Sequence, residues 1–140
     1  MKAVALILGL LGTPLAAQSV IPQGTGDAPL RAALAQPGLI IDGISTWPVD
    51  WDGVPPTDLL VQTVYASAAG GNASGLEYRI VTPTPTGPTL GDTFVLPGNG
   101  IKEVQTHPQG ALLIQYLYRD GDPRCCPSGL ISTILSRGTP

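Results

Sequence analysis

Glycine and proline interrupt this chain so often that it has little room for long helices. The sequence holds 18 glycines and 15 prolines, well above the usual shares of these residues. Glycine weakens a helix interior, and proline removes a hydrogen-bond donor from it. The charged fraction of 12% is also low for a globular chain. This composition predicts short strands separated by frequent turns.

Residues 1–17 have the three parts of a secretory signal peptide. Met1 and Lys2 give a positive start, an apolar run follows over 3–11, and a small-residue exit ends at Ala17. The apolar run is too short to span a bilayer, which takes about 20 apolar residues, so an uncleaved membrane anchor is the weaker alternative. We therefore expect cleavage after Ala17 and a soluble protein in the periplasm or outside the cell.

The residue after this exit is Gln18, where an exported lipoprotein would carry the cysteine that accepts a lipid. We therefore expect no lipid anchor, and no later stretch is long and apolar enough for a membrane span. The net charge is −3, and loss of Lys2 with the signal peptide would make it more negative. An acidic chain without clustered Lys and Arg argues against nucleic acid as a partner.

One short helix is predicted over residues 27–35. Asp27 can cap its free amides, Pro29 is tolerated in the first turn, and a Pro-Gly pair follows it. Its apolar residues share one face: Leu30, Ala33 and Leu34. So short a helix is marginal alone and must dock on another element.

The remaining apolar runs predict a mainly β fold, with an antiparallel sheet of about five or six strands built from hairpins and the helix packed on it. The run 59–66 is apolar on both faces at its start, as expected for a central strand. We expect 18–26 to be a flexible leader and 27–140 to form a single small β-rich domain. The expected strands are 59–66, 76–81, 94–96, 101–106, 111–118 and 130–135, with hairpins joining 59–66 to 76–81 and 101–106 to 111–118. The runs 39–41 and 44–47 are a candidate short strand and its return, joined by a turn at 42–43.

The unusual chemistry of the chain is a pair of adjacent cysteines, Cys125 and Cys126, in a turn between two predicted strands. Exported proteins normally use cysteines in disulfides. Ordinary disulfides place the Cα atoms roughly 4.4–6.8 Å apart, whereas neighbours across a trans peptide lie about 3.8 Å apart. A bridge between them would close a small ring that is easier to reduce than a structural disulfide.

Four states of this pair stay open from the sequence. The pair can form a vicinal disulfide that shapes the turn, two thiols without chemistry, an intermolecular bridge, or a functional redox or soft-metal pair. Pro123 and Pro127 bias the residues before them toward extended conformations. We therefore expect a rigid loop supported by Asp122, Pro123, Pro127 and Ser128.

The sequence predicts no cofactor, metal site or catalytic residue. Structural zinc takes four ligands, and His107 is the one histidine of the chain. Asp50, Asp52 and Gly53 are similar to the start of a calcium loop, but Val54 and two prolines occupy the next ligand places. A turn in which the aspartates bond local amides is the favoured interpretation. The chain also lacks a nucleophile motif such as Gly-x-Ser-x-Gly.

The stretch Gly-Asp-Pro-Arg-Cys-Cys-Pro-Ser at 121–128 follows an aromatic-rich strand and resembles the signature of the LppP/LprE family of exported bacterial lipoproteins. The glycine-rich loop at 70–75 and the Leu-Gly-Asp at 90–92 are also similar to the layout of that family. The resemblance covers roughly 58–136. It implies an envelope location and little mechanism, since the family is largely uncharacterised, and Gln18 departs from its lipid attachment site.

Three functional hypotheses follow. The first is a non-enzymatic exported domain that binds an envelope protein or a small ligand. The alternative is a thiol redox or sensor protein that uses Cys125 and Cys126. The third is binding of a ligand or a sugar through Trp47, Trp51 and the tyrosines, whose flat faces allow stacking.

Overall fold

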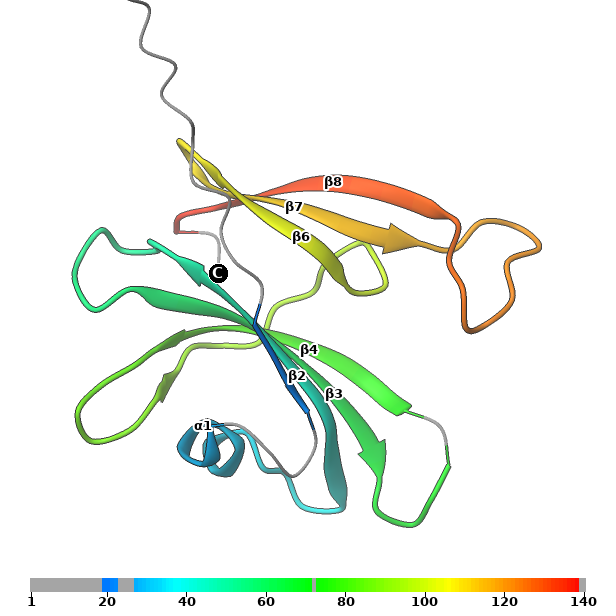
Figure 1. Cartoon of the computed structure of the whole chain (residues 1–140), viewed down its shortest axis with the longest axis horizontal. Coiled ribbons are helices and arrows are strands. Elements are labelled where there is room, and N and C mark those ends of the chain that lie inside the picture. Colours follow the sequence, from blue (N-terminus) through cyan, green and yellow to red (C-terminus); the bar gives the residue numbers. More distant parts are fainter. Residues whose placement is uncertain (1–18, 23–26, 72, 139–140) are drawn as a thin grey trace, which may run out of the picture.

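The computed structural model describes residues 19–22, 27–71 and 73–138. These residues form eight strands and one helix, arranged as two antiparallel sheets. The predicted mainly β class with one short helix is confirmed. The prediction of one sheet of five or six strands is wrong, because the strands divide between two sheets (Figure 1). The expected signal peptide over 1–17 and Gln18 lie outside the described residues.

The larger sheet has the strand order β1-β2-β3-β4-β5, and each neighbouring pair is antiparallel. The predicted hairpin between 59–66 and 76–81 is confirmed as β3 and β4. The strands are β1 (Ser19–Pro22), β2 (Leu39–Val49), β3 (Asp58–Ser67), β4 (Ala73–Thr82) and β5 (Thr89–Leu90).

The smaller sheet has the order β6-β7-β8 and is also antiparallel. The second predicted hairpin is confirmed as β6 and β7, and the predicted last strand, β8, pairs with β7. The strands are β6 (Ile101–His107), β7 (Gly110–Leu117) and β8 (Gly129–Ser136).

Three segments differ from the sequence prediction. β2 is one strand where two strands around a turn were expected, because a bulge between Ile41 and Gly43 absorbs the extra residue. Phe94 forms only an isolated bridge with Tyr78, so the strand expected over 94–96 is absent. Within the expected flexible leader, Ser19–Pro22 forms β1 on the edge of β2.

The helix α1 (Ala28–Ala33) covers one face of the larger sheet (Figure 1). Its predicted cap is present, since the Asp27 carboxylate accepts a hydrogen bond from the Leu30 amide at 3.2 Å. Leu30 and Leu34 are buried, whereas Ala33 is exposed, so the docking stripe is narrower than predicted. The two leucines pack against buried side chains of the sheet: Ile41, Ile44, Val61, Tyr65 and Val81.

α1 is too short to cross a membrane, and the described part of the chain contains no helix with the length and apolar character of a span.

The opposite face of the larger sheet packs on the smaller sheet. β3 contributes to both faces, since Leu60 points to the smaller sheet and Val61 to the helix, and both are buried. The prediction that this run is a central strand buried on both sides is therefore confirmed. The core between the sheets contains Trp47, Val49, Leu60, Tyr78, Leu96, Ile101, Val104, Ala111, Leu113 and Leu135.

Two buried glutamines hold the connection that carries the chain from one sheet to the other. The Gln62 side-chain oxygen accepts from the Ile101 amide at 2.7 Å. The Gln115 side chain accepts from the Gly98 amide at 3.0 Å and donates to the Thr133 hydroxyl at 2.9 Å. A β-carbon at Gly98 would lie 2.4 Å from the β-carbon of Gln115, so only glycine fits this close approach. The two glutamine side chains thus accept hydrogen bonds from the Gly98 and Ile101 amides, which a neighbouring strand would otherwise have to accept.

Replacing Leu30 with alanine should show how much the docked helix contributes to stability. Leu30 is 2% exposed, and a buried Leu→Ala change costs about 2–5 kcal/mol. Leu130→Ala is the matched control, because Leu130 is 49% exposed and its loss should cost under about 1 kcal/mol. Urea denaturation followed by circular dichroism measures both. Equal losses of unfolding free energy would contradict the docking of α1.

Candidate functional site

The predicted cysteine site lies in the connection between β7 and β8, at one end of the smaller sheet (Figure 1). Cys125 and Cys126 form a disulfide with their Cα atoms 3.8 Å apart, and both residues are exposed. Of the four states left open by the sequence, the structure contains the vicinal disulfide. Because it joins neighbours, this bond connects no distant parts of the fold.

The Asp122 carboxylate organises the cysteine turn. One of its oxygens accepts hydrogen bonds from the amides of Arg119 and Ser128, both at 2.8 Å. These two donors favour the charged carboxylate and hold the pKa of Asp122 below its usual value. The structure thus brings Asp122 and Ser128, both expected to support the turn, into direct contact.

Further hydrogen bonds close the turn without using the sulfur atoms. The Asp122 amide donates to the Arg119 carbonyl at 3.0 Å, and the Cys126 amide donates to the Pro123 carbonyl at 2.9 Å. The Tyr118 hydroxyl donates to the Arg124 carbonyl. Pro123 therefore contributes its carbonyl oxygen to the turn. Pro127 is half-buried and lies next to this network.

An exposed apolar surface adjoins the cysteine turn. It lies on the outer face of the smaller sheet, where Tyr116 and Leu130 are cross-strand partners. Alternation along β7 correctly separates two faces in the sequence, but it does not show which face is buried. The buried face contains Gln115, and the more apolar face points to solvent. The large exposed side chains of this surface are Tyr116, Tyr118, Leu130 and Ile134.

A pocket of about 400 Å³ opens at the other end of the smaller sheet. It lies where the two sheets meet, and elements far apart in the sequence form its wall. Trp51 comes from the loop after β2, Ile80 from β4, Phe94 from the connection between the sheets, and Leu135 from β8. Asp92 is at the same wall.

The aromatic side chains of the chain have different environments. Trp47 is fully buried in the core, so it offers no face to a ligand, which corrects this part of the stacking hypothesis. Trp51 is half-buried and lines the pocket. Phe94, also in the pocket wall, stacks on Tyr78 with ring centroids 6.2 Å apart. The sequence indicated Trp51, but nothing local to residue 94 indicated that Phe94 would join it.

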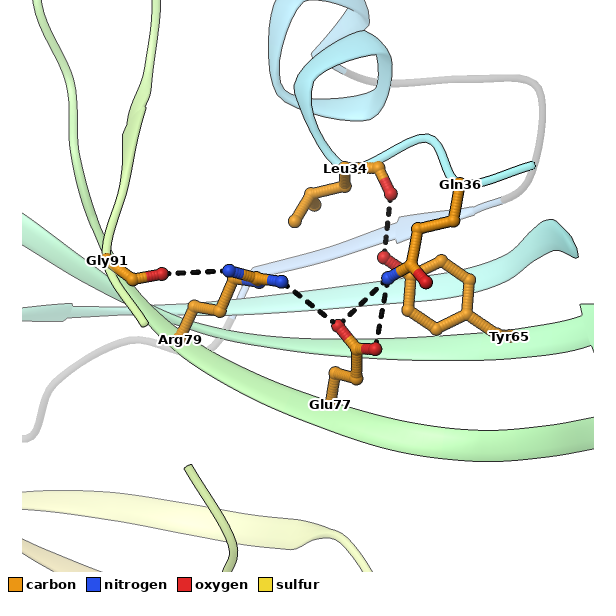
Figure 2. Close-up of polar contacts among 6 residues, drawn as sticks. All are labelled: Leu34, Gln36, Tyr65, Glu77, Arg79 and Gly91. Atoms are coloured by element: carbon orange, nitrogen blue, oxygen red, sulfur yellow. Dashed lines mark hydrogen bonds and ion pairs between the residues drawn. The ribbon is translucent and has the colours of Figure 1, made fainter. Parts of the chain in front are cut away.

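A polar cluster on the helix side of β4 anchors both the helix and the pocket rim (Figure 2). The Glu77 carboxylate accepts from the Gln36 amide nitrogen at 3.0 and 3.1 Å and lies 3.4 Å from the Arg79 guanidinium. Arg79 also donates to the Gly91 carbonyl at 2.9 Å. The charges of this cluster are therefore engaged within the fold, and we assign it a structural role.

The hydroxyl of Tyr65 completes this cluster on the side of the helix (Figure 2). It donates to the Leu34 carbonyl at 2.7 Å, where the helix ends. Burial raises the pKa of Tyr65, so the hydroxyl keeps the proton that it donates.

The other residues singled out in the sequence have local roles. Asp52 accepts a hydrogen bond from the Val54 amide at 2.8 Å, which confirms the turn interpretation for this residue. Asp50 is exposed, and its carboxylate lies 4.0 Å from Arg137. The ring of His107 accepts from the Gln109 amide at 3.2 Å. Within residues 27–71 and 73–138, no three His, Cys, Asp or Glu side chains gather as metal ligands would.

No family model, curated protein or solved structure matches this chain. The resemblance of the cysteine turn to the LppP/LprE signature therefore stays a prediction.

Replacing Asp122 with asparagine should remove a titration from the cysteine turn. The pKa of Asp122 is lowered in the folded protein. The carboxylate therefore stabilises the turn at pH values above the ordinary pKa of an aspartate, which is about 4. This stabilisation is lost as the pH falls through the folded pKa. The amide NMR shifts of Arg119 and Ser128 should therefore move with an apparent pKa below that of an ordinary aspartate. In Asp122→Asn these movements should vanish.

Asp120→Asn serves as the matched control, because Asp120 is an exposed neighbour in the same turn. This variant should keep the titration of both amides. If the two amides still titrate in Asp122→Asn, the turn is not organised by this carboxylate.

Proposed function

We propose that this chain is an exported, non-enzymatic binding domain that takes a small, mainly apolar ligand between its sheets. The observation that carries the proposal is the pocket of about 400 Å³ with Trp51 and Phe94 in its wall. Ligand sites are typically clefts of about 300–1,000 Å³ with apolar walls and a few polar groups. The signal-like pattern over 1–17 supports export.

The wall of the pocket favours a neutral or cationic ligand with an aromatic or alicyclic body. Trp51 and Phe94 provide flat faces, and the aliphatic wall comes from Ile80, Leu90 and Leu135. Among the described residues that line the pocket, Asp92 is the ionisable one. Its carboxylate would repel an anion and attract a hydroxyl or ammonium group.

The rim of the pocket is held in place before any ligand enters. The Gly91 amide donates to the Ile80 carbonyl at 2.9 Å, and the Phe94 amide donates to the Tyr78 carbonyl at 3.1 Å. The Arg79 guanidinium, which comes from β4, donates a further hydrogen bond to the Gly91 carbonyl at 2.9 Å. A wall that is already ordered loses little conformational freedom on binding, so more of the contact energy becomes affinity.

The lining residues support binding over catalysis. General acid–base catalysis uses groups positioned to exchange a proton with the reacting molecule, commonly as an acid and a base together. The described wall offers Asp92 together with the hydroxyls of Thr82 and Thr89. The Thr82 hydroxyl already donates to the Asp58 carboxylate. This arrangement suits a site that orients a ligand through one or two polar contacts.

Titration with N-phenyl-1-naphthylamine, a neutral aromatic probe, tests the proposal. The chain has two tryptophans, so Trp51→Phe leaves Trp47 as a buried reference. We expect saturable binding with a change in tryptophan emission that Trp51→Phe removes. Phe94→Ala should weaken binding about tenfold by the loss of an aromatic contact. Tyr116→Ala, a control on the outer face of the smaller sheet, should bind as the parent does.

The 8-sulfonate of the same probe tests the role of Asp92. The added negative charge should weaken binding about tenfold, and Asp92→Asn should narrow this difference. Absence of saturable binding, or equal binding by Phe94→Ala and the parent chain, would count against the pocket as the binding site.

A further inference from the structure

We propose that Cys125–Cys126 is a reversible thiol–disulfide exchange site whose partner is a dithiol protein. The site lies at the end of the smaller sheet away from the pocket. β8 begins at Gly129, after the cysteine turn, and Leu135 reaches the pocket near the other end of the same strand. The proposal therefore stands apart from ligand binding.

The position of the disulfide favours a reactive role over a structural one. Both cysteines are exposed, so an attacking thiolate can reach the sulfur atoms. A disulfide stabilises a fold mainly by closing a loop, and its contribution grows with loop length. Here the bonded residues are adjacent, with Cα atoms 3.8 Å apart. Exposed disulfides of this kind are the labile ones, in contrast to buried structural bridges.

The turn is built so that it can keep its shape when the disulfide opens. Asp122 binds the Arg119 and Ser128 amides, and the Cys126 amide binds the Pro123 carbonyl. None of these hydrogen bonds involves a sulfur atom. Reduction should therefore leave two thiols side by side on an ordered loop, ready to form the same bond again.

The exchange consists of two balanced steps. A thiolate of the partner attacks one sulfur of the Cys125–Cys126 bond, which breaks as a mixed disulfide forms and the other cysteine leaves as a thiolate. The second thiolate of the partner then attacks the mixed disulfide and releases the remaining cysteine. Two electrons pass from the dithiol, which becomes a disulfide, to the pair. The two partner protons end on Cys125 and Cys126 as thiols.

The surface beside the disulfide favours a protein over a small thiol as the partner. Tyr116 near the end of β7 and Leu130 near the start of β8 are cross-strand partners on either side of the turn, and Tyr118 lies between β7 and the turn. These side chains are 37%, 49% and 40% exposed. A protein that docks there can bury this apolar surface, and aromatic side chains often dominate such contacts. A molecule the size of glutathione covers little of it.

Reduction of the purified chain by different thiols tests the proposal. The oxidised chain is mixed with dithiothreitol, glutathione or reduced thioredoxin at equal thiolate concentration, because the thiolate is the attacking species. The samples are quenched, alkylated and weighed by mass spectrometry. Both dithiols should produce chains with both cysteines alkylated, and oxidised dithiothreitol should restore the disulfide. Thioredoxin should react about tenfold or more faster than glutathione, as expected if it buries a contact worth that factor.

Substitutions at two exposed residues distinguish docking of a partner protein from the intrinsic reactivity of the disulfide. Leu130→Ser should slow thioredoxin about tenfold, the loss of one good apolar contact, and leave the rate with dithiothreitol unchanged. Ile40→Ser is the matched control, because Ile40 is 45% exposed on the larger sheet; it should leave both rates unchanged. A thioredoxin whose second cysteine is replaced by serine should remain attached to the chain through one disulfide.

Different results would contradict the exchange site and the choice of a protein partner. A disulfide that resists excess dithiothreitol, or thiols that fail to rejoin with oxidised dithiothreitol, would overturn the exchange site. Equal rates with glutathione and thioredoxin, together with no effect of Leu130→Ser, would overturn the choice of a protein partner. Neither result depends on whether the pocket binds its probe.

Discussion

Burial of β3 from both sides is the constraint on which the rest of this fold depends. Leu60 and Val61 are consecutive, yet each lies in a different core cluster. One face of the larger sheet therefore needs the helix as a cover, and the other needs a second sheet. The chain must cross between the sheets through the edge of the core, where Gln62 and Gln115 take up the amides of the crossing segment. Joining two sheets by a short connection thus requires polar side chains in the core, because the buried amides of the connection need acceptors.

The same crossing segment explains why a pocket exists at all. A chain that leaves one sheet and enters another cannot fill every space with regular strands. Gly91 and Phe94 hydrogen-bond to β4 and then turn toward the smaller sheet, which leaves room beside Trp51. The crossing segment then runs to the opposite end of the smaller sheet, where the Asn99 amide donates to the Tyr116 carbonyl shortly before the cysteine turn. The length of β8 separates the pocket, which Leu135 helps to line, from the exposed disulfide.

Local patterns in the sequence predict the hairpins, the helix cap and the rigid cysteine turn, because each depends on residues close in the chain. They do not predict two sheets, since alternation shows that a strand has two faces but not what covers them. β7 is the clearest example, because its apolar face is exposed and the face with Gln115 is buried. The pocket could not be predicted from the sequence either, because Trp51, Phe94 and Leu135 come together only in the tertiary structure. Trp47 resembled Trp51 in sequence, and only packing distinguishes them.

The two outer strands of the smaller sheet are protected very differently from other chains. β6 has Lys102 and Glu103 along its length, and such charges discourage the approach of a foreign strand. Gly129–Ser136 contains no charged residue and no proline, and no described strand pairs with its outer edge. Neither a charge nor a proline on this strand would oppose the approach of an extended peptide. Of the two outer strands of the smaller sheet, β8 is therefore the one with less protection against pairing with a foreign strand.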